Sequence, residues 1–86
     1  MSFEFDPAKS LANEAKHGIN FVAAQHMWED ENRLEIRART VGEARWMIVA
    51  RIDEQVWAAI VTYRDDKVRL ISVRKARKDE VRLYEG

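Results

Sequence analysis

The sequence predicts a small α+β protein in which two helices precede an antiparallel meander of four strands. Apolar residues recur with helical spacing before residue 30, alternate with polar residues from residue 33, and return to helical spacing at the end. A run of helices followed by a run of strands is typical of α+β domains. We expect one domain over residues 1–86, in the order short N-terminal strand, two helices, four strands and C-terminal helix.

A brief strand and a helix open the chain. The segment FEF at residues 3–5 is short and alternating, which indicates a strand. Asp6 is a favourable N-cap, Pro7 suits the first helical position, and Gly18 can adopt the left-handed conformation that ends a helix. The stripe that we expect to face the sheet consists of Ala8, Leu11, Ala12 and Ala15.

A second helix is predicted for the segment FVAAQHMWED at residues 21–30, with Asn20 as its N-cap. Its inward side chains should be Phe21, Ala24 and either Met27 or Trp28.

The spacing predicts four strands and a last helix after residue 32. The segment RLEIRAR places Leu34, Ile36 and Ala38 on one face, as in a half-exposed strand. The later strands are apolar on both sides, as is typical of the centre of a sheet. These central strands should contain residues 45–52, 55–64 and 68–74, and the last helix residues 75–86.

The composition is that of a globular protein from a reducing compartment. Hydrophobic residues make up 47% and charged residues 35%, and cysteine is absent. No apolar run approaches the roughly 20 residues of a membrane span, and the N-terminus lacks the pattern of a signal peptide. We therefore expect a cytoplasmic protein. Its formal net charge of zero argues against a nonspecific nucleic-acid binder, although a local basic face is compatible with it.

Lys16 and His17 stand directly before Gly18, and two interpretations apply to them. Cations near a helix C-terminus are favoured by the helix dipole, so they can simply complete the helix end. A histidine can also move a proton near neutral pH, and a lysine can hold a phosphate. The two roles are compatible with each other.

Arg64 and Arg74 each end a predicted strand. With a three-residue turn at residues 65–67, Arg64 would share a face with Val68, Leu70 and Arg74. Arginine binds phosphate through two parallel hydrogen bonds, so two arginines on one face suit an extended anion. The alternative is that both end in surface ion pairs.

Other polar residues are less informative alone. Glu43 and Arg45 should form a surface pair that approaches Arg64 if the hairpin is tight. On the last helix, we favour core packing for Tyr84 and a solvated charge for Glu80. Metal ligands are not expected, since cysteine is absent and His17 and His26 lack the spacing of a helical metal pair.

Five segments in order resemble one family, the BrnT toxins of bacterial type II toxin–antitoxin systems. The motifs are FEFDPAK at residues 3–9, N-x-x-KHG-I-x-F at 13–21, EARW at 43–46, VTYR at 61–64, and RLISVRKA followed by Glu80 and Tyr84 over residues 69–84.

This resemblance implies a RelE-like fold and an endoribonuclease that inhibits translation. It implies an RNA substrate, a BrnA-like antitoxin as partner, and contact with DNA only through that antitoxin. A membrane partner and a cofactor are not expected. Lys16, His17, Arg64 and Arg74 match the family's motifs and are the candidate catalytic residues. We also expect substrate contacts from Arg45 and Arg69, and support from Glu43, Glu80 and Tyr84.

A second hypothesis is a noncatalytic binding module of the same fold, whose arginines serve an acidic partner protein. Three tryptophans are many for a chain of 86 residues. We therefore expect at least one of Trp28, Trp46 and Trp57 to be partly exposed, because aromatic residues are enriched where partners bind.

Overall fold

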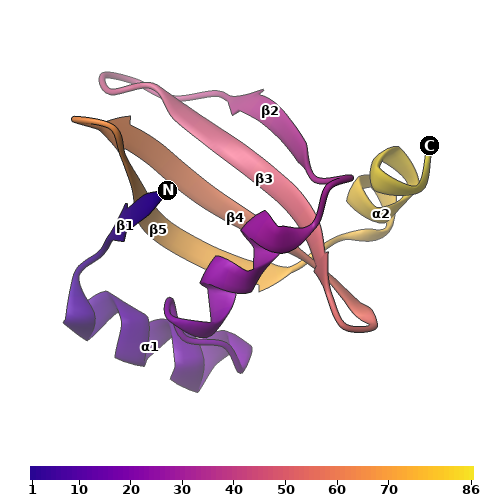
Figure 1. Ribbon diagram of the computed structural model, residues 1–86, viewed down its shortest axis with the longest axis horizontal. Helices are drawn as coiled ribbons and strands as arrows, with labels where there is room; N and C mark the ends of the chain where they lie inside the picture. The colour runs from indigo at the N-terminus through magenta and orange to yellow at the C-terminus, as the bar shows by residue number, and fades with distance from the viewer.

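The computed structural model describes residues 1–86 and contains a five-stranded mixed sheet, two α-helices and one 3-10 helix (Figure 1). The strands lie in the order β1-β5-β4-β3-β2. Neighbouring strands are antiparallel, except that β1 and β5 are parallel. The elements are β1 (Ser2–Glu4), α1 (Pro7–His17), η1 (Ala23–Glu29), β2 (Leu34–Ala38), β3 (Arg45–Ile52), β4 (Gln55–Arg64), β5 (Lys67–Lys75) and α2 (Lys78–Glu85).

The α+β class, the order of the elements and the three central strands are confirmed. Two details differ from the sequence-based expectation. The sheet is not purely antiparallel, because β1 joins it as a fifth strand parallel to β5. The second helix is a 3-10 helix rather than an α-helix, and the N–H of Gln25 accordingly bonds to Val22 three residues earlier. A strand of three residues carries no local signal for the orientation of its pairing.

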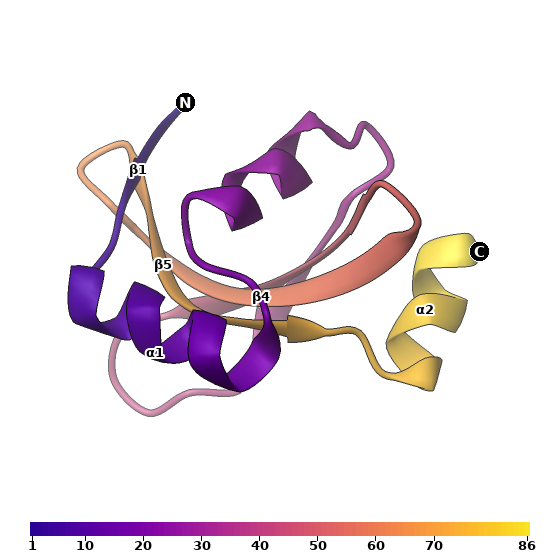
Figure 2. The same ribbon diagram turned by 90° about the horizontal axis from the view of Figure 1, so that it is seen from below.

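The hydrophobic core lies on one face of the sheet, called here the core face, beneath the segment that contains η1 (Figure 2). Phe21, Ala24 and Met27 are fully buried against it, as predicted. Their partners on β3, β4 and β5 are Ile48, Ala50, Ala59, Val61, Val68, Leu70 and Val73. The opposite face of the sheet, called here the outer face, is contacted at one end by α2, whose Glu80 bonds to Arg74 and whose Tyr84 lies against Arg51. All three tryptophans are only partly buried, which confirms the expectation of partial exposure.

Helix α1 begins and ends where its sequence predicts but turns a different side to the sheet. Asp6 accepts a hydrogen bond from the N–H of Ala8, and Gly18 has a φ of 78°. The buried residues, however, are Ser10 and Asn13. The predicted apolar stripe is wrong, because Ala8, Leu11, Ala12 and Ala15 are all exposed.

The polar side of α1 is buried because it covers the free edge of β5 (Figure 1). Beyond the three residues paired with β1, β5 has no neighbouring strand on that side. The amide of Asn13 donates to the carbonyl oxygen of Val73 at 2.9 Å and accepts from its N–H at 3.1 Å. It also donates to the carbonyl oxygen of Ile19 at 2.8 Å. The Asn13 side chain therefore bonds the N–H and C=O groups of Val73 that a neighbouring strand would otherwise bond at this edge.

The β4–β5 hairpin has a different register from the one predicted. The turn consists of Asp65 and Asp66, which both have positive φ, as in the type I′ turns that favour tight hairpins. Arg64 therefore pairs with Lys67 rather than Val68. Val68 and Leu70 consequently face the core, and the arginine face receives Arg69 instead.

A bulge restores the predicted position of Arg74. The pairing shifts between Ile60 and Val61, whose partners are Ser72 and Leu70. The extra residue on β5 returns Ser72 and Arg74 to the face of Ile60. Arg64, Arg69 and Arg74 therefore all belong to the outer face.

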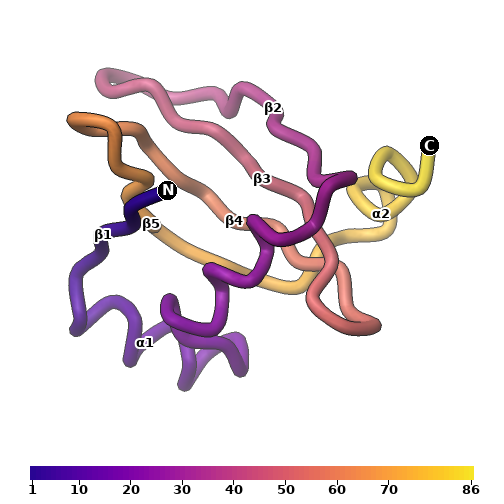
Figure 3. Tube along the Cα trace, in the orientation of Figure 1, coloured from indigo at the N-terminus to yellow at the C-terminus, as the bar shows by residue number.

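Helix α2 packs against β3 and carries the C-terminus away from the N-terminus (Figure 3). None of the helices is long and apolar enough to cross a membrane.

Candidate nucleic-acid interface

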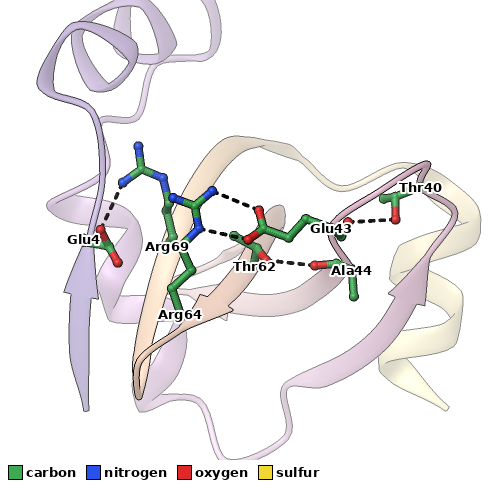
Figure 4. Close-up of polar contacts among 7 residues, drawn as sticks. All are labelled: Glu4, Thr40, Glu43, Ala44, Thr62, Arg64 and Arg69. Carbon is green, nitrogen blue, oxygen red and sulfur yellow. Dashed lines mark hydrogen bonds and ion pairs between the residues drawn. The ribbon is translucent and has the colours of Figure 1, made fainter.

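One end of the outer face carries three arginines whose positions are set by the β3–β4–β5 meander and its two-residue turn. We call Arg45, Arg64 and Arg69, together with Glu4 and Glu43, the outer arginine cluster; Figure 4 shows all of these residues except Arg45. Glu4 on β1 lies opposite Arg69 on β5, and Arg69 lies opposite Thr62 on β4. Residues from the first strand and from β5 therefore meet at this end of the sheet.

Arg64 is held by the loop between β2 and β3. Its Nε and Nη2 donate to the two carboxylate oxygens of Glu43 at 2.9 and 3.0 Å (Figure 4). The loop is fixed by Thr40, which donates to the carbonyl oxygen of Glu43, and by Thr62, which donates to that of Ala44. The predicted approach of Glu43 to Arg64 is confirmed, but the predicted ion pair of Glu43 with Arg45 is wrong, because both carboxylate oxygens of Glu43 bond to Arg64 instead.

Arg69 completes the cluster by donating from Nη1 to Glu4 at 3.1 Å. The two ion pairs also act on each other. The hydrogen bond from Arg64 lowers the pKa of Glu43, and the charges of Arg45 and Arg69 lower it further. This cluster contains three cations and two anions, so its charge is positive although that of the whole chain is zero.

Arg74 forms a separate pair with Glu80 on α2. Its Nη1 and Nη2 donate to the two carboxylate oxygens at 2.8 and 2.9 Å. Glu80 also accepts from the N–H of Arg77 and is only 6% exposed. The expectation of a solvated charge at Glu80 is therefore wrong. Glu80 is buried because α2 starts directly after β5 and folds its first turn back onto Arg74.

The Arg74–Glu80 pair predicts a dependence of stability on pH. The hydrogen bonds from Arg74 lower the pKa of Glu80 and outweigh burial, which raises it. The contribution of the pair is therefore complete above the unfolded pKa of about 4.3 and is lost as the pH falls through the lower folded pKa.

We expect Glu80→Gln to lower the free energy of unfolding by about 1–2 kcal/mol at pH 7 and by less at pH 3. Urea unfolding at both pH values measures this difference. An equal loss at both pH values would contradict the assignment.

Lys16 and His17 form the end of α1, and neither takes part in one of the four ion pairs. Lys16 is exposed, whereas His17 is half-buried. His17 follows Asn13 by four residues and therefore shares its helix face, which turns toward β5. Since Asn13 bonds to Val73, the residue before Arg74, His17 belongs to the region beside the C-terminal end of β5.

The predicted site residues therefore fall into two groups. Arg45, Arg64 and Arg69 lie together, whereas Arg74 lies in a second group with Glu80.

Tyr84 lies apart from these arginines, and its expected core packing is wrong. Its hydroxyl donates to Asp30 at 2.5 Å, and the guanidinium of Arg51 lies 5.7 Å from its ring centre. Burial raises the pKa of Asp30, but hydrogen bonds from Tyr84, Arg51 and Asn32 outweigh it and lower the pKa. Asp30 is not among the site residues predicted from the sequence, because its partners come from distant segments. Together these groups line a cleft of about 520 Å³ between η1, the β3–β4 turn and α2.

The fold and its outer face define a small α+β protein whose sheet presents arginines on that face. A family model described as the ribonuclease toxin BrnT of type II toxin–antitoxin systems matches residues 5–80. The chain therefore belongs to the BrnT family of ribonuclease toxins. Membership of this family implies an antitoxin as partner. A comparison with individually curated proteins gives no match.

Proposed function

We propose that the chain is a metal-independent endoribonuclease that cleaves RNA, inhibits translation and is neutralised by a BrnA-like antitoxin. The observation that carries this proposal is the alignment of Arg64, Arg69 and Arg74 on one face of the sheet. RNA provides its own nucleophile in the 2′-hydroxyl group. The protein has to supply a proton acceptor or donor and positive charge for the phosphorus centre.

The arginines suit an extended polyanion better than a single phosphate. Arg69 and Arg74 are separated by five positions on β5, roughly 15–17 Å for an extended strand. Each guanidinium has N–H groups beyond those used with its carboxylate, and these remain for phosphate oxygens. We propose that Arg45 and Arg69 bind flanking phosphates, while Arg64 and Arg74 act nearer the reacting one.

His17 is the proposed acid or base, and Lys16 the proposed neighbouring cation. Support comes from the attachment of α1 to β5 through Asn13, which fixes the helix end relative to Arg74. A proton-transferring group requires such a fixed position. Glu43 and Glu80 orient Arg64 and Arg74, and Tyr84 supports the position of α2 through Asp30.

The antitoxin is proposed to be an acidic, BrnA-like protein that covers the outer face and alone contacts DNA. The arginines of this face already accept carboxylate partners within the chain, so carboxylates of another protein suit them equally. The RelE-like arrangement of a sheet with flanking helices is part of the same proposal. The binding of carboxylates by these arginines also favours a noncatalytic binding module as the alternative function.

The test is cleavage of a defined RNA by the purified chain in the presence of EDTA. We expect cleavage that leaves a 2′,3′-cyclic phosphate, because the 2′-hydroxyl attacks the adjacent phosphorus and displaces the 5′-oxygen. An RNA with a single 2′-deoxy sugar at the cut position is the matched control and should remain intact there. Tight antitoxin binding without cleavage would instead support the binding module.

A further inference from the structure

A cleft of about 540 Å³ lies between the end of α1, the start of η1 and the β3–β4 turn (Figure 1). We call it the Trp57 cleft, and its lining includes Gly18, Ile19, Asp53, Glu54, Gln55 and Trp57. Its volume is within the range of small-molecule sites, about 300–1,000 Å³. None of these residues has a role in the proposed cleavage of RNA, so the cleft has no assigned ligand.

The Trp57 cleft lies next to the proposed acid or base. Gly18 lines the cleft and directly follows His17. The amide of Asn13 donates to the carbonyl oxygens of both Ile19 and Val73, at 2.8 and 2.9 Å. It therefore fixes one wall of the cleft to the C-terminal part of β5, which carries Arg74.

The pairing of β4 with β5 places a free cation beside the same cleft. Trp57 lies directly opposite Lys75, the residue after Arg74. Opposite residues of an antiparallel pair have Cβ atoms about 4.5–5.5 Å apart. Lys75 is exposed and takes part in none of the four ion pairs. A nucleotide whose base enters the cleft would therefore have its phosphate within reach of Lys75.

Trp57 differs from the other two tryptophans in its neighbours. The ring of Trp28 lies 5.0 Å from that of Phe3, and the ring of Trp46 lies 6.3 Å from that of Tyr63. Trp57 is half-buried but forms no such pair with an aromatic ring or a guanidinium group of the chain. Its ring is therefore available to a nucleobase, and stacking of this kind binds single-stranded RNA.

The charges of the cleft select a base rather than a phosphate. Its lining contains the carboxylates of Asp53 and Glu54 but neither lysine nor arginine. A carboxylate accepts two parallel hydrogen bonds, and guanine offers two adjacent donors, N1–H and the N2 amino group. Uracil offers one N–H between two carbonyl oxygens, and adenine and cytosine have an acceptor nitrogen beside their amino group. Guanine is therefore the base that matches this lining.

We propose that the Trp57 cleft binds one guanine base of the RNA, stacked on Trp57 and read by Glu54. Glu54 is assigned because it lines this cleft alone, whereas Asp53 also lines the cleft beside Tyr84. Lys75 contacts the phosphate of the bound nucleotide and directs it toward His17. This inference rests on the proposed ribonuclease function and adds a base preference to it.

Binding of guanosine 3′-monophosphate and uridine 3′-monophosphate to the full chain tests the proposal without requiring cleavage. The NMR signals of the three indole N–H groups are assigned by single Trp→Phe substitutions. We expect the guanosine nucleotide to shift the signal of Trp57 and to bind at least tenfold more tightly than the uridine nucleotide. Equal affinities, or shifts only at Trp28 or Trp46, would overturn the proposal. A chain that binds guanine but leaves RNA intact would contradict the proposed function alone.

Substitutions in the cleft separate stacking from base reading, with Kd measured by calorimetry. Trp57→Ala should weaken binding of the guanosine nucleotide by about tenfold or more, and Trp57→Phe, which keeps a ring and its packing, by less. Glu54→Gln should weaken it by about tenfold, because the amide group places a donor against a donor of guanine. Trp46→Phe, on the same sheet face but outside the cleft, is the control and should bind as the wild type does. Wild-type affinity in Trp57→Ala or in Glu54→Gln would refute the assignment.

Discussion

Replacing Asn13 with alanine is expected to lower the free energy of unfolding by about 3–5 kcal/mol, a large effect for one polar side chain. Asn13 makes three buried hydrogen bonds, to the carbonyl oxygens of Ile19 and Val73 and from the N–H of Val73. Alanine leaves all three backbone groups without a partner, and each such loss costs about 1–3 kcal/mol. The edge of β5 and the position of α1 both depend on this amide.

Urea unfolding of Asn13→Ala beside Leu11→Ala measures the effect against a matched control on the same helix. Leu11 is 70% exposed, so its truncation should change the free energy of unfolding by no more than about 0.5 kcal/mol. Asn13→Asp is a useful third variant, because it keeps the size of the side chain but cannot donate to the two carbonyls. A larger loss from Leu11→Ala than from Asn13→Ala would restore the apolar stripe predicted from the sequence.

Alanine at His17 or Arg74 is expected to lower the rate of RNA cleavage by about 100-fold or more, if the proposed function is correct. His17→Ala removes the proposed proton carrier. Arg74→Ala removes positive charge from the reacting phosphate, and should also reduce the dependence of binding on salt. Single-turnover cleavage, corrected for the folded fraction of each variant, measures both rates.

Arg82→Ala is the matched control, because it removes the same charge from an exposed position on α2. It should cleave at nearly the wild-type rate. Melting temperatures separate lost activity from lost structure, which matters for Arg74 because its removal leaves Glu80 buried without its partner. Wild-type rates in both His17→Ala and Arg74→Ala would exclude the mechanism and favour the binding module.

Features set by neighbouring residues were predictable from the sequence. The cap at Asp6, the left-handed glycine at Gly18 and the alternation of β2 all depend on local chemistry, and the structure has each of them. The buried side of α1 was not predictable in this way. Helical periodicity assumes that the apolar stripe faces the protein, but α1 covers a strand edge, whose exposed N–H and C=O groups require polar partners.

The candidate site likewise has some features that the sequence predicts and others that it does not. The family motifs contain Arg64 and Arg74, and the approach of Glu43 to Arg64 follows from a tight hairpin. The place of Arg69 beside Arg64 depends instead on a two-residue turn, and that of Arg74 on a bulge. Asp30 joins residues separated by up to 54 positions, and no local pattern indicates such a contact.

The carboxylates that hold the outer arginines affect which anions can bind there. A carboxylate that the fold holds beside a guanidinium competes with external anions, because it is already in place at a high effective concentration. Free phosphate, which engages one guanidinium at a time, has to displace this competitor without compensation elsewhere. A polyanion that reaches several of these arginines exchanges all the carboxylates in one binding event. If the outer face binds RNA as proposed, these ion pairs within the chain disfavour small anions and favour long ones.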